Sequence, residues 1–346
     1  MTWAWWPHTT DSRVASYRLR CLQIVATLRD VGQDVSLYQP DGPAPTVMVL
    51  SKRYDRQSVR QAVSLRERAG TRLVLDLCDN HFFFKDDPEA RFADRADALR
   101  EACSLSDLVI AASPALADVV RQEVPTANVA VIPDAVEQPA DSSGFRTLFR
   151  PAAAWRMRRL ESFVRRTPRP RRVIWFGSHG SPGVDAGLQD LAAIRGYLEK
   201  ATASAPLCLT VVSNNTSAFE TVTAGWKTPV FYLPWDASTF SQALRIHSLA
   251  IIPIGSNPFT RCKTANRVLT AAVHGLNVVA DAIPSYEPMR DALVLDDWLY
   301  GLGAYLDDTS RRRDDQARLR AHAMTEYSLA QITQQWQETL GRLSPK

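Results

Sequence analysis

Lys263, Asn266 and Arg267 bring two positive charges and an amide close together in the second half of the chain. If a helix runs from about Arg261 to His274, spacings of three and four residues place these side chains on one face, near the helix start. The free N–H groups of a helix start, the helix dipole and the side-chain charges all attract an anion. These residues therefore indicate an anion-binding site, and a solvated helix face is the alternative.

The flanking segments indicate how this helix is held. An apolar run, Leu249–Ile254, precedes a polar loop, and Gly275 and a second apolar run, Asn277–Asp281, follow the helix. Strand, loop, helix, glycine and strand are the order of a parallel α/β unit. The apolar side of the helix is then expected to pack on a sheet.

The same alternation of strand-like and helical segments occurs in both halves of the chain. The sequence has 346 residues, of which 45% are hydrophobic and 23% charged, as is typical of a globular protein with two domains. We expect an α/β fold with a doubly wound parallel sheet in residues 1–137 and another in residues 171–308. An arginine-rich linker and helix, 138–170, joins them, and helices in 309–346 are expected to pack back across the domains.

The sequence favours a cytoplasmic location. No apolar run approaches the roughly 18 residues of a membrane span, and the first residues lack the basic and apolar regions of a secretory signal. The cysteines are odd in number and lack the short spacings of metal or redox sites. We expect reduced thiols, mostly in the core, at Cys21, Cys78, Cys103, Cys208 and Cys262.

Ligands of doubly wound sheets bind beyond the carboxyl ends of the strands, so residues that directly follow expected strands are the next candidates. In the second half, Gly177–Gly180 could bring backbone N–H groups close to a phosphate, because glycine has no Cβ. Trp235 could stack on a nucleobase. An ordinary turn and a surface aromatic are the respective alternatives.

In the first half, Asp79, Asn80 and His81 follow the apolar strand Arg72–Leu77. A histidine at such a place can act as a base or as a hydrogen-bond donor, although a lone histidine in a loop often does neither. His8 and the start of the first helix are expected beside the same edge of the sheet, where the strands have their carboxyl ends. The candidates for contact with a ligand at this edge are His8, Ser16, Arg18, Asp79 and Asn80.

Two common nucleotide motifs are absent. The loops after the first expected strand of each half read WPHTTDS and GSHGSPG, and neither is a G-x-G-x-x-G fingerprint. The sequence also has no G-x-x-x-x-G-K-[ST]. Nicotinamide and P-loop chemistry are therefore disfavoured.

Three motifs resemble those of a known family. They are VIPDAVE before the linker, WFGSHG at the start of the second half, and N-x-F-x-x-C-K-T-A-N-R-x-L-x-x-A-x-x-G-L-x-V-V-A-D. Together with the two-domain layout, they look like the GT-B sugar-nucleotide glycosyltransferases, in particular the retaining group. The resemblance implies two Rossmann-like domains that face a central cleft, and transfer of a sugar from a nucleotide-diphosphate sugar.

The resemblance also implies roles for residues of this sequence. His81 would be the histidine of the cleft, and Lys263 would neutralise the diphosphate during catalysis. The residues expected at the donor diphosphate and sugar are Gly177, Ser178, His179, Gly180, Asn257, Lys263, Thr264, Asn266 and Arg267. The residues expected near the base are Asn214, Trp235 and Asp236.

The chain departs from the family pattern at two positions. Many retaining members carry glutamates where this sequence has Cys262 and Thr270. Positive charge placed at the leaving diphosphate lowers the barrier without a metal, so we expect Lys263 to stabilise it with no metal and no other cofactor. A catalytically degenerate GT-B protein that only binds is the alternative.

The segment from Arg146 to Arg172 is the most asymmetric in charge, with ten arginines and one acid, Glu161. A basic amphipathic helix of this kind could lie on an anionic membrane surface and bring the enzyme to a lipid-linked or surface glycan acceptor. It could instead bind DNA, as phage enzymes that glucosylate hydroxymethylated bases do. A solvated helix between domains is the third interpretation. The membrane alternative would place the protein peripherally at the inner membrane face.

Overall fold

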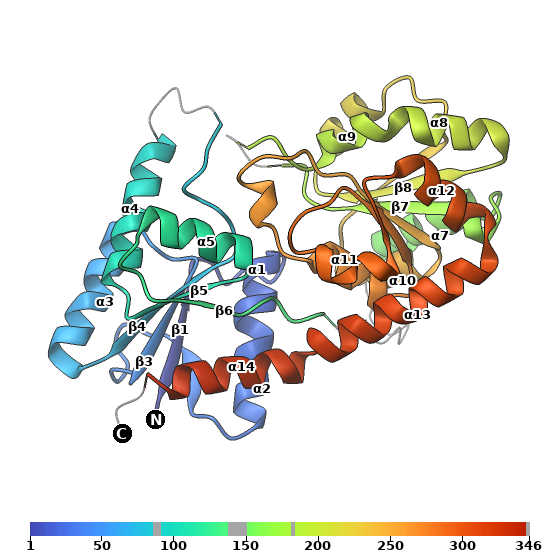
Figure 1. The fold of residues 1–346 in the computed structure, drawn as a ribbon. Coiled ribbons are helices and arrows are strands. Elements are labelled where there is room, and N and C mark those ends of the chain that lie inside the picture. The colour runs from blue at the N-terminus through green and yellow to red at the C-terminus, as the bar shows by residue number, and fades with distance from the viewer. Residues whose placement is uncertain (86–90, 138–150, 181–183, 344–346) are drawn as a thin grey trace. The chain divides into compact units, whose positions relative to one another are not determined.

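The computed structural model describes residues 1–85, 91–137, 151–180 and 184–343, which form two compact units. Unit 1 comprises Met1–Glu137, Arg261–Thr264 and Thr325–Lys346, and unit 2 comprises Gln138–Thr260 and Ala265–Met324. Unit 1 thus includes Arg261–Thr264, a segment that lies between the two parts of unit 2 in the sequence. Figure 1 shows a parallel sheet with helices around it in each unit.

Unit 1 is built on a six-stranded sheet in the order β2-β1-β3-β4-β5-β6, with every pair parallel. Its strands are β1 (Trp3–Pro7), β2 (Val35–Leu37), β3 (Val47–Ser51), β4 (Arg72–Leu77), β5 (Leu108–Ala111) and β6 (Val129–Val131). Its helices are α1 (Ala15–Tyr17), a π-helical segment (Arg18–Leu22), α2 (Gln23–Asp30), α3 (Arg56–Ala69), α4 (Arg91–Leu105), α5 (Pro114–Glu123) and α14 (Leu329–Gly341).

Unit 2 has a second parallel six-stranded sheet, in the order β12-β11-β10-β7-β8-β9. Its strands are β7 (Arg172–Phe176), β8 (Cys208–Ser213), β9 (Val230–Pro234), β10 (Leu249–Ile252), β11 (Asn277–Ala280) and β12 (Val294–Leu295). Its α-helices are α7 (Pro151–Val164), α8 (Arg195–Ser204), α9 (Thr216–Thr223), α10 (Phe240–Arg245), α11 (Asn266–Val273), α12 (Trp298–Asp307) and α13 (Thr309–Glu326), whose last two residues belong to unit 1. The 3₁₀ segments of the chain are Arg169–Arg171, Leu188–Ile194, Thr260–Cys262 and Glu287–Ala292.

The expected α/β fold with two parallel sheets is confirmed. In each sheet, the strand order reverses direction at one place, between β1 and β3 in unit 1 and between β7 and β10 in unit 2. Doubly wound sheets bind ligands beyond the carboxyl ends of the strands at this switch point. The loops at the two switch points are those that begin at His8 and Lys52 in unit 1, and at Gly177 and near Gly255 in unit 2.

The last helix of the chain completes the core of unit 1. The Trp336 ring of α14 lies 5.4 Å from that of Trp5 on β1, measured between centroids. Both indoles are fully buried, as are Ile332 and Leu340 on the same helix. Figure 1 shows α14 alongside α2. Burial of large apolar side chains is the main source of stability here.

The helix predicted near Lys263 was wrong in extent. It was expected from about Arg261 to His274 but begins only at Asn266, because Thr260–Cys262 is a 3₁₀ turn and Lys263 lies in the loop. Lys263 therefore does not share a helix face with Arg267.

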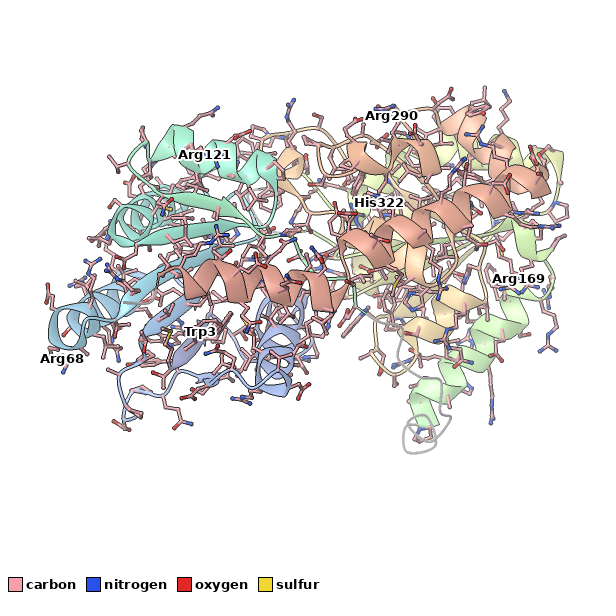
Figure 2. The ribbon with its side chains drawn as sticks, turned by 60° about the horizontal axis from the view of Figure 1, so that its bottom comes forward. Trp3, Arg68, Arg121, Arg169, Arg290 and His322 are labelled. Atoms are coloured by element: carbon pink, nitrogen blue, oxygen red, sulfur yellow. The ribbon has the colours of Figure 1, made fainter. Side chains whose placement is uncertain are left out.

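The arginine-rich segment divides into exposed and internal residues. On α7 and the turn that follows it, Arg156, Arg158, Arg159, Arg165, Arg166 and Arg169 are exposed. Figure 2 shows Arg169 in that turn. Arg171 is instead buried and pairs with Asp307 at 2.7 Å. Arg146 and Arg150 lie outside the described residues, and no described helix is long and apolar enough to cross a membrane.

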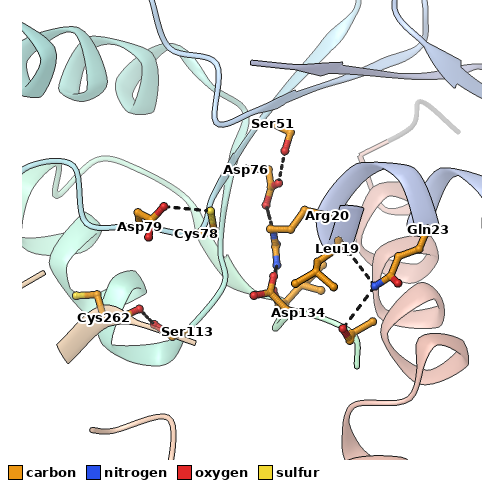
Figure 3. A network of polar contacts seen from close by, with 12 residues as sticks. Leu19, Arg20, Gln23, Ser51, Asp76, Cys78, Asp79, Ser113, Asp134 and Cys262 are labelled. Carbon is orange, nitrogen blue, oxygen red and sulfur yellow. Dashed lines mark hydrogen bonds and ion pairs between the residues drawn. The ribbon is translucent and has the colours of Figure 1, made fainter. Parts of the chain in front are cut away.

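A buried ion network joins the first helical region to the sheet of unit 1 (Figure 3). Arg20, in the π-helical segment, donates through Nε to Asp76 Oδ1 at 2.7 Å and through Nη1 to Asp134 Oδ1 at 2.9 Å. The three residues are at most 4% exposed. Ser51 Oγ donates to the second oxygen of Asp76 at 2.7 Å. The network thus ties the ends of β3, β4 and β6 to the helix that carries Arg20.

Arg20→Ala should lower the free energy of unfolding by about 3–5 kcal/mol, because it leaves Asp76 and Asp134 buried without their cation. Equilibrium denaturation in urea measures this change. Arg13→Ala is the control, because Arg13 pairs with Asp11 at the surface, where ion pairs contribute little. A loss no larger than that of the control would contradict a structural role for Arg20.

Candidate active site

Asp79, just beyond β4, is the centre of the polar cluster in unit 1. Its Oδ1 accepts from Lys263 Nζ at 2.5 Å, and its Oδ2 accepts from Lys52 Nζ. Lys52 follows β3 directly and has a left-handed backbone, with φ of 53°. Two cations from distant parts of the chain therefore meet on one carboxylate at the switch-point edge of the sheet.

The charges of this cluster determine its protonation. Burial alone would raise the pKa of Asp79, but the positive charges of Lys263 and then Lys52 hold it well below its ordinary value. The pKa of Lys52 is raised despite burial, in part by the Asp79 carboxylate. Asp79 is thus ionised at neutral pH and acts as a counter-ion, not as a proton donor. Two lysines and one carboxylate leave this edge with an excess of positive charge.

His81 is oriented by a chain of hydrogen bonds. Arg95 Nε donates to the Tyr54 hydroxyl at 2.6 Å, and that hydroxyl lies 2.6 Å from His81 Nδ1. A guanidinium can only donate, so the single hydroxyl proton of Tyr54 is directed at Nδ1. His81 Nδ1 is then the acceptor, and the ring proton is on Nε2, which lies 3.9 Å from Asp79 Oδ2.

This arrangement bears on the two roles expected for His81. Burial, followed by the charge of Lys52, lowers the pKa of His81 to about 2. A neutral ring with its proton on Nε2 can offer that proton to an oxygen but cannot accept another proton there. The geometry supports His81 as a hydrogen-bond donor rather than a general base.

The other candidates of the first half have mainly structural contacts. Asn80 is buried, and its Oδ1 accepts from the Phe82 N–H at 3.2 Å. Arg18 pairs with Glu137 at 2.6 Å. Ser16 Oγ is buried without a hydrogen-bond partner among the described residues. The backbone of His8 is bonded to Ser51, and partial burial, then the charges of Lys52 and Arg53, lowers its pKa.

In unit 2, Gly177–Gly180 forms a tight loop after β7. Gly180 has φ of 129°, and a Cβ on Gly187 would lie 2.7 Å from the Gly180 nitrogen. Only glycine allows this approach of two backbones. His179 N donates to Asn214 Oδ1 at 3.1 Å, so the expected base-side residue Asn214 contacts the loop. Residues 181–183, the rest of the expected glycine motif, lie outside the described residues.

Asp190 links this loop to the loop after β10. Its Oδ2 accepts from Gly187 N at 2.9 Å, and the carboxylate also bonds the backbone of Gly255. Burial raises the pKa of Asp190, and these backbone bonds oppose the rise. The two loops at the switch point of unit 2 are thus held together by one half-buried carboxyl group.

Arg267 lies beside the glycine loop. A Cβ on Gly177 would lie 3.6 Å from Arg267 Nη1, so the guanidinium reaches the glycine loop. It also hydrogen-bonds the buried Tyr286. Arg267 is the second residue of α11, whose start has no side-chain cap. Free N–H groups of a helix start, a guanidinium and a glycine loop are the usual components of a phosphate site.

The remaining candidates of unit 2 hold its loops. Asn257 Nδ2 donates to Asp185 O at 2.8 Å, and its Oδ1 accepts from Thr260 N at 2.9 Å. Asp236 Oδ1 accepts from Ser238 Oγ at 2.6 Å. Trp235 is half-buried and lies against Phe240, with ring centroids 6.4 Å apart. Asn266 begins α11, and Thr264, half-buried, belongs to unit 1.

Cys262 does not replace a carboxylate. It is buried in the unit 1 core, and its backbone oxygen accepts from Ser113 Oγ at 2.8 Å (Figure 3). Burial raises the pKa of the thiol to about 11, so it is neutral at physiological pH. Cys262 therefore positions the neighbouring Lys263 rather than contributing charge of its own.

Some residues of the site were missed from the sequence. They are Lys52, Tyr54 and Arg95 in unit 1 and Asp190 and Tyr286 in unit 2. Lys52 and Tyr54 follow β3, so the rule that selected Asp79 beyond its strand would have selected them too. Arg95, on α4, carries no signal in the sequence that distinguishes it from other surface arginines.

No protein-family model and no curated protein matches this sequence. Solved structures do match the fold. HepE of Anabaena, in complex with UDP and glucose, aligns over 99% of both chains, with a TM-score of 0.63 and 15% sequence identity. TarM of S. aureus, with fondaparinux, alpha-GlcNAc-glycerol and UDP, aligns over 93% of this chain and 58% of its own, with a TM-score of 0.59 and 11% identity.

A third match is a UDP-forming alpha,alpha-trehalose-phosphate synthase from Burkholderia vietnamiensis. It aligns over 93% of this chain and 74% of its own, with a TM-score of 0.59 and 12% identity. At such low identities, the likeness establishes the fold. The chain has the two-domain α/β fold of the GT-B structures, as the motifs led us to expect.

The tautomer of His81 can be tested by NMR of protein with ¹⁵N-labelled histidine. At pH 6 to 8, we expect the His81 signals, assigned with His81→Gln, to show a bare Nδ1 and a protonated Nε2. Tyr54→Phe removes the directing hydroxyl and should shift these signals. Tyr38→Phe, which removes a hydroxyl bonded instead to Gln61, is the control. A doubly protonated ring at pH 6 would contradict the assignment.

Two buried histidines should make the protein sensitive to acid. Burial lowers the pKa of His247 to about 4, and that of His81 is about 2, both below the ordinary 6.5. Below pH 6.5, the unfolded chain therefore binds protons that the folded chain does not, and stability is lost as the pH falls. Between pH 5.5 and 4.5, each histidine should contribute a slope of up to about 1.4 kcal/mol per pH unit.

Urea denaturation at several pH values measures this slope. His81→Gln and His247→Gln should each reduce this slope by the contribution of about one bound proton, whatever their effect on the stability at pH 7. An unchanged slope in the His81→Gln variant would show that this histidine is not neutral in the folded protein.

Proposed function

We propose that this protein is a glycosyltransferase that transfers a sugar from a nucleotide-diphosphate sugar to an acceptor. The observation that carries the proposal is the match with HepE over 99% of both chains, because HepE has been solved with UDP-glucose and with UDP and glucose. The glycine loop, the start of α11 and Arg267 are the features of unit 2 that suit a diphosphate. UDP-glucose is accordingly the first donor to test.

The charged residues have different roles in the proposed transfer. As the glycosidic bond of the donor breaks, negative charge grows on the leaving diphosphate. Arg267 and the backbone N–H groups at the start of α11 stabilise this charge. Lys263 lies two residues before Ala265, the N-cap residue of α11. It supplies a further cation when the diphosphate competes with Asp79 for the Lys263 ammonium group. Lys52 remains as the counter-ion of Asp79, so that the buried carboxylate is never left without a cation.

His81 has a separate role in this proposal. Its Nε2–H donates to an oxygen of the bound sugar or acceptor. The Arg95–Tyr54 chain keeps that proton on Nε2, so the donor of the hydrogen bond is in place before the substrate arrives. We propose that transfer needs no metal, because Lys263 and Arg267 provide the positive charge. Activity that persists in excess EDTA would support this, and activity restored only by a divalent cation would contradict it.

For the acceptor, we propose a surface or lipid-linked glycan. TarM has been solved with fondaparinux and alpha-GlcNAc-glycerol, which are saccharide compounds, and its fold matches that of this chain. The exposed arginines of α7 then face anionic groups of the acceptor or of the membrane that holds it. Salt-sensitive binding to DNA, without binding to anionic vesicles, would favour a DNA acceptor instead.

Thermal-shift measurements with UDP-, GDP-, ADP-, TDP- and CMP-sugars test donor binding. We expect stabilisation by one nucleotide series, because a ligand that binds only the folded state raises the melting temperature. Arg267→Gln should abolish this shift. If no nucleotide sugar stabilises the protein, the glycosyltransferase proposal fails and a degenerate GT-B binding protein is favoured.

Lys263→Ala should reduce the rate of donor hydrolysis or transfer by about 10²–10³, as expected for the loss of one group that stabilises transition-state charge. Release of the nucleoside diphosphate from the donor measures the rate. Lys227→Ala, which removes an exposed lysine of unit 2, is the control. A folded Lys263→Ala protein with full activity would exclude this role for Lys263.

A further inference from the structure

Unit 2 has a shallow hollow on its surface, between α7 and β9, the last strand of its sheet. The hollow has a volume of about 290 Å³ and is lined by Arg159, Ser162, Phe163, Arg166 and Phe231. Arg159, Ser162 and Arg166 follow one another at spacings of three and four residues, so they lie along one side of α7 and the turn after it. None of the lining residues belongs to the donor site of Proposed function.

The rim of the hollow is cationic. Arg159 and Arg166 are exposed, and neither guanidinium forms an ion pair or a hydrogen bond within the part of the chain that the structure describes. Arg159 lies over the Trp155 ring, with Cζ 4.7 Å from the ring centroid, which leaves the N–H groups in the guanidinium plane available. Ser162 is exposed too, and its hydroxyl has no hydrogen-bond partner among the described residues. Two guanidinium groups and a hydroxyl suit a phosphate group.

The exposed side of α7 extends this positive charge. Arg156, Arg158 and Arg165 are exposed, and they too have no ion pair with another described residue. Glu161, the one acid of α7, is half-buried and accepts from Gln242 Nε2 at 2.8 Å. An anionic surface is complementary to such a helix, because each basic residue near that surface adds to the attraction.

The floor of the hollow is apolar. The rings of Phe163 and Phe231 have centroids 5.3 Å apart, and both residues are half-buried, so part of each ring stays accessible. Trp155, one turn before Arg159, is 57% exposed, and tryptophan is enriched at membrane–water interfaces. A phospholipid carries hydrocarbon next to its phosphate, whereas the backbone of DNA carries phosphate and sugar without hydrocarbon. The apolar floor beside the arginines therefore favours a lipid over a nucleic acid.

The apolar side of α7 limits how the helix can meet a membrane. Ala153, Met157, Leu160 and Val164 are buried within unit 2. An amphipathic helix that lies in a membrane buries its apolar side among the lipids, and here that side is already packed inside the protein. The helix can therefore meet a membrane only through its arginine side, so the binding depends on charge and on the hollow and is sensitive to salt.

We propose that the exposed side of α7 docks unit 2 on a membrane of anionic phospholipids. Arg159, Arg166 and Ser162 hold a lipid phosphate, and Phe163 and Phe231 contact the adjoining glycerol and hydrocarbon. This identifies the partner of the α7 arginines, and it rests on Proposed function only in that a lipid-linked acceptor would lie at such a membrane. Docking needs neither donor nor transfer, so the two proposals fail separately: absent vesicle binding refutes the docking, and absent donor binding refutes the transfer.

Co-sedimentation of the full chain with vesicles tests the docking. We expect binding to phosphatidylcholine vesicles that contain about one third phosphatidylglycerol, and none to phosphatidylcholine alone. Raising the salt concentration from about 0.1 M to about 1 M should release the protein, because the Debye length falls from about 10 Å to about 3 Å. Equal binding to both kinds of vesicle, or none to either, would overturn the proposal.

Soluble competitors identify the source of the phosphate. Glycerol 3-phosphate, at the phosphate concentration of the vesicles, should leave the protein on the vesicles, since it brings one phosphate and no surface. Release by glycerol 3-phosphate would assign the hollow to a soluble phosphate ester and overturn the docking. Binding to duplex DNA without binding to the vesicles would overturn it in favour of a nucleic acid.

Matched variants locate the surface. Arg159→Gln with Arg166→Gln should weaken vesicle binding by about 20-fold or more, because each arginine near an anionic surface contributes about fivefold. Arg60→Gln with Arg68→Gln removes the same charge from exposed positions of α3, which have no ion pair with the described residues, and should leave the binding unchanged. Equal effects of the two pairs would refute α7 as the docking surface.

Two further variants test the apolar contacts without changing the charge. Anionic vesicles should shift the tryptophan emission of the protein to shorter wavelengths, and Trp155→Phe should remove this shift. Trp226→Phe, which replaces a half-buried tryptophan of unit 2, is the control and should keep it. Phe231→Ser should weaken vesicle binding. An emission shift that persists in Trp155→Phe, or an unchanged affinity of folded Phe231→Ser protein, would refute the respective contact.

Discussion

The carboxylate of Asp79 is the constraint on which the arrangement of unit 1 depends. A buried carboxylate must be paired or it is strongly destabilising, and Asp79 is paired with Lys52 and Lys263. One lysine comes from the loop after β3, and the other from a segment that interrupts the sequence of unit 2. The hydrogen bond from Ser113 to Cys262 secures the same segment. The need to neutralise Asp79 therefore explains why Arg261–Thr264 packs in unit 1.

Asp76 and Asp79 are close together in the sequence but have different surroundings. Asp76, within β4, is enclosed with Arg20 and Ser51 and supports the fold. Asp79, beyond the end of the same strand, shares its charge with Lys263, whose side chain is 37% exposed. An ion pair with one accessible partner can exchange that partner for a ligand, whereas the enclosed pair cannot without a large cost. The two carboxylates thus differ in how accessible their cations are.

The sequence predicted the two sheets, but not the contacts that hold the candidate residues in place. Alternation of apolar and helical segments is a local signal, and the residues after β4, β7 and β10 could be selected from it. The side chain of Tyr54 reaches His81 and Arg95 across long stretches of sequence, and no local pattern encodes such a meeting. The prediction that the helix includes Lys263 was wrong for the same reason, because the ion pair with Asp79 keeps that residue in the loop before the helix.

The absence of a carboxylate at position 262 can be understood from where Cys262 lies. Its side chain is 2% exposed in an apolar cluster, and a carboxylate there would be buried beside the ionised Asp79. Burial raises the pKa of the Cys262 thiol, and the Asp79 charge already adds to this rise. A second buried carboxylate beside Asp79 would be disfavoured in the same way. A neutral residue at position 262 therefore goes together with an ionised Asp79 and with a Lys263 that is paired to it.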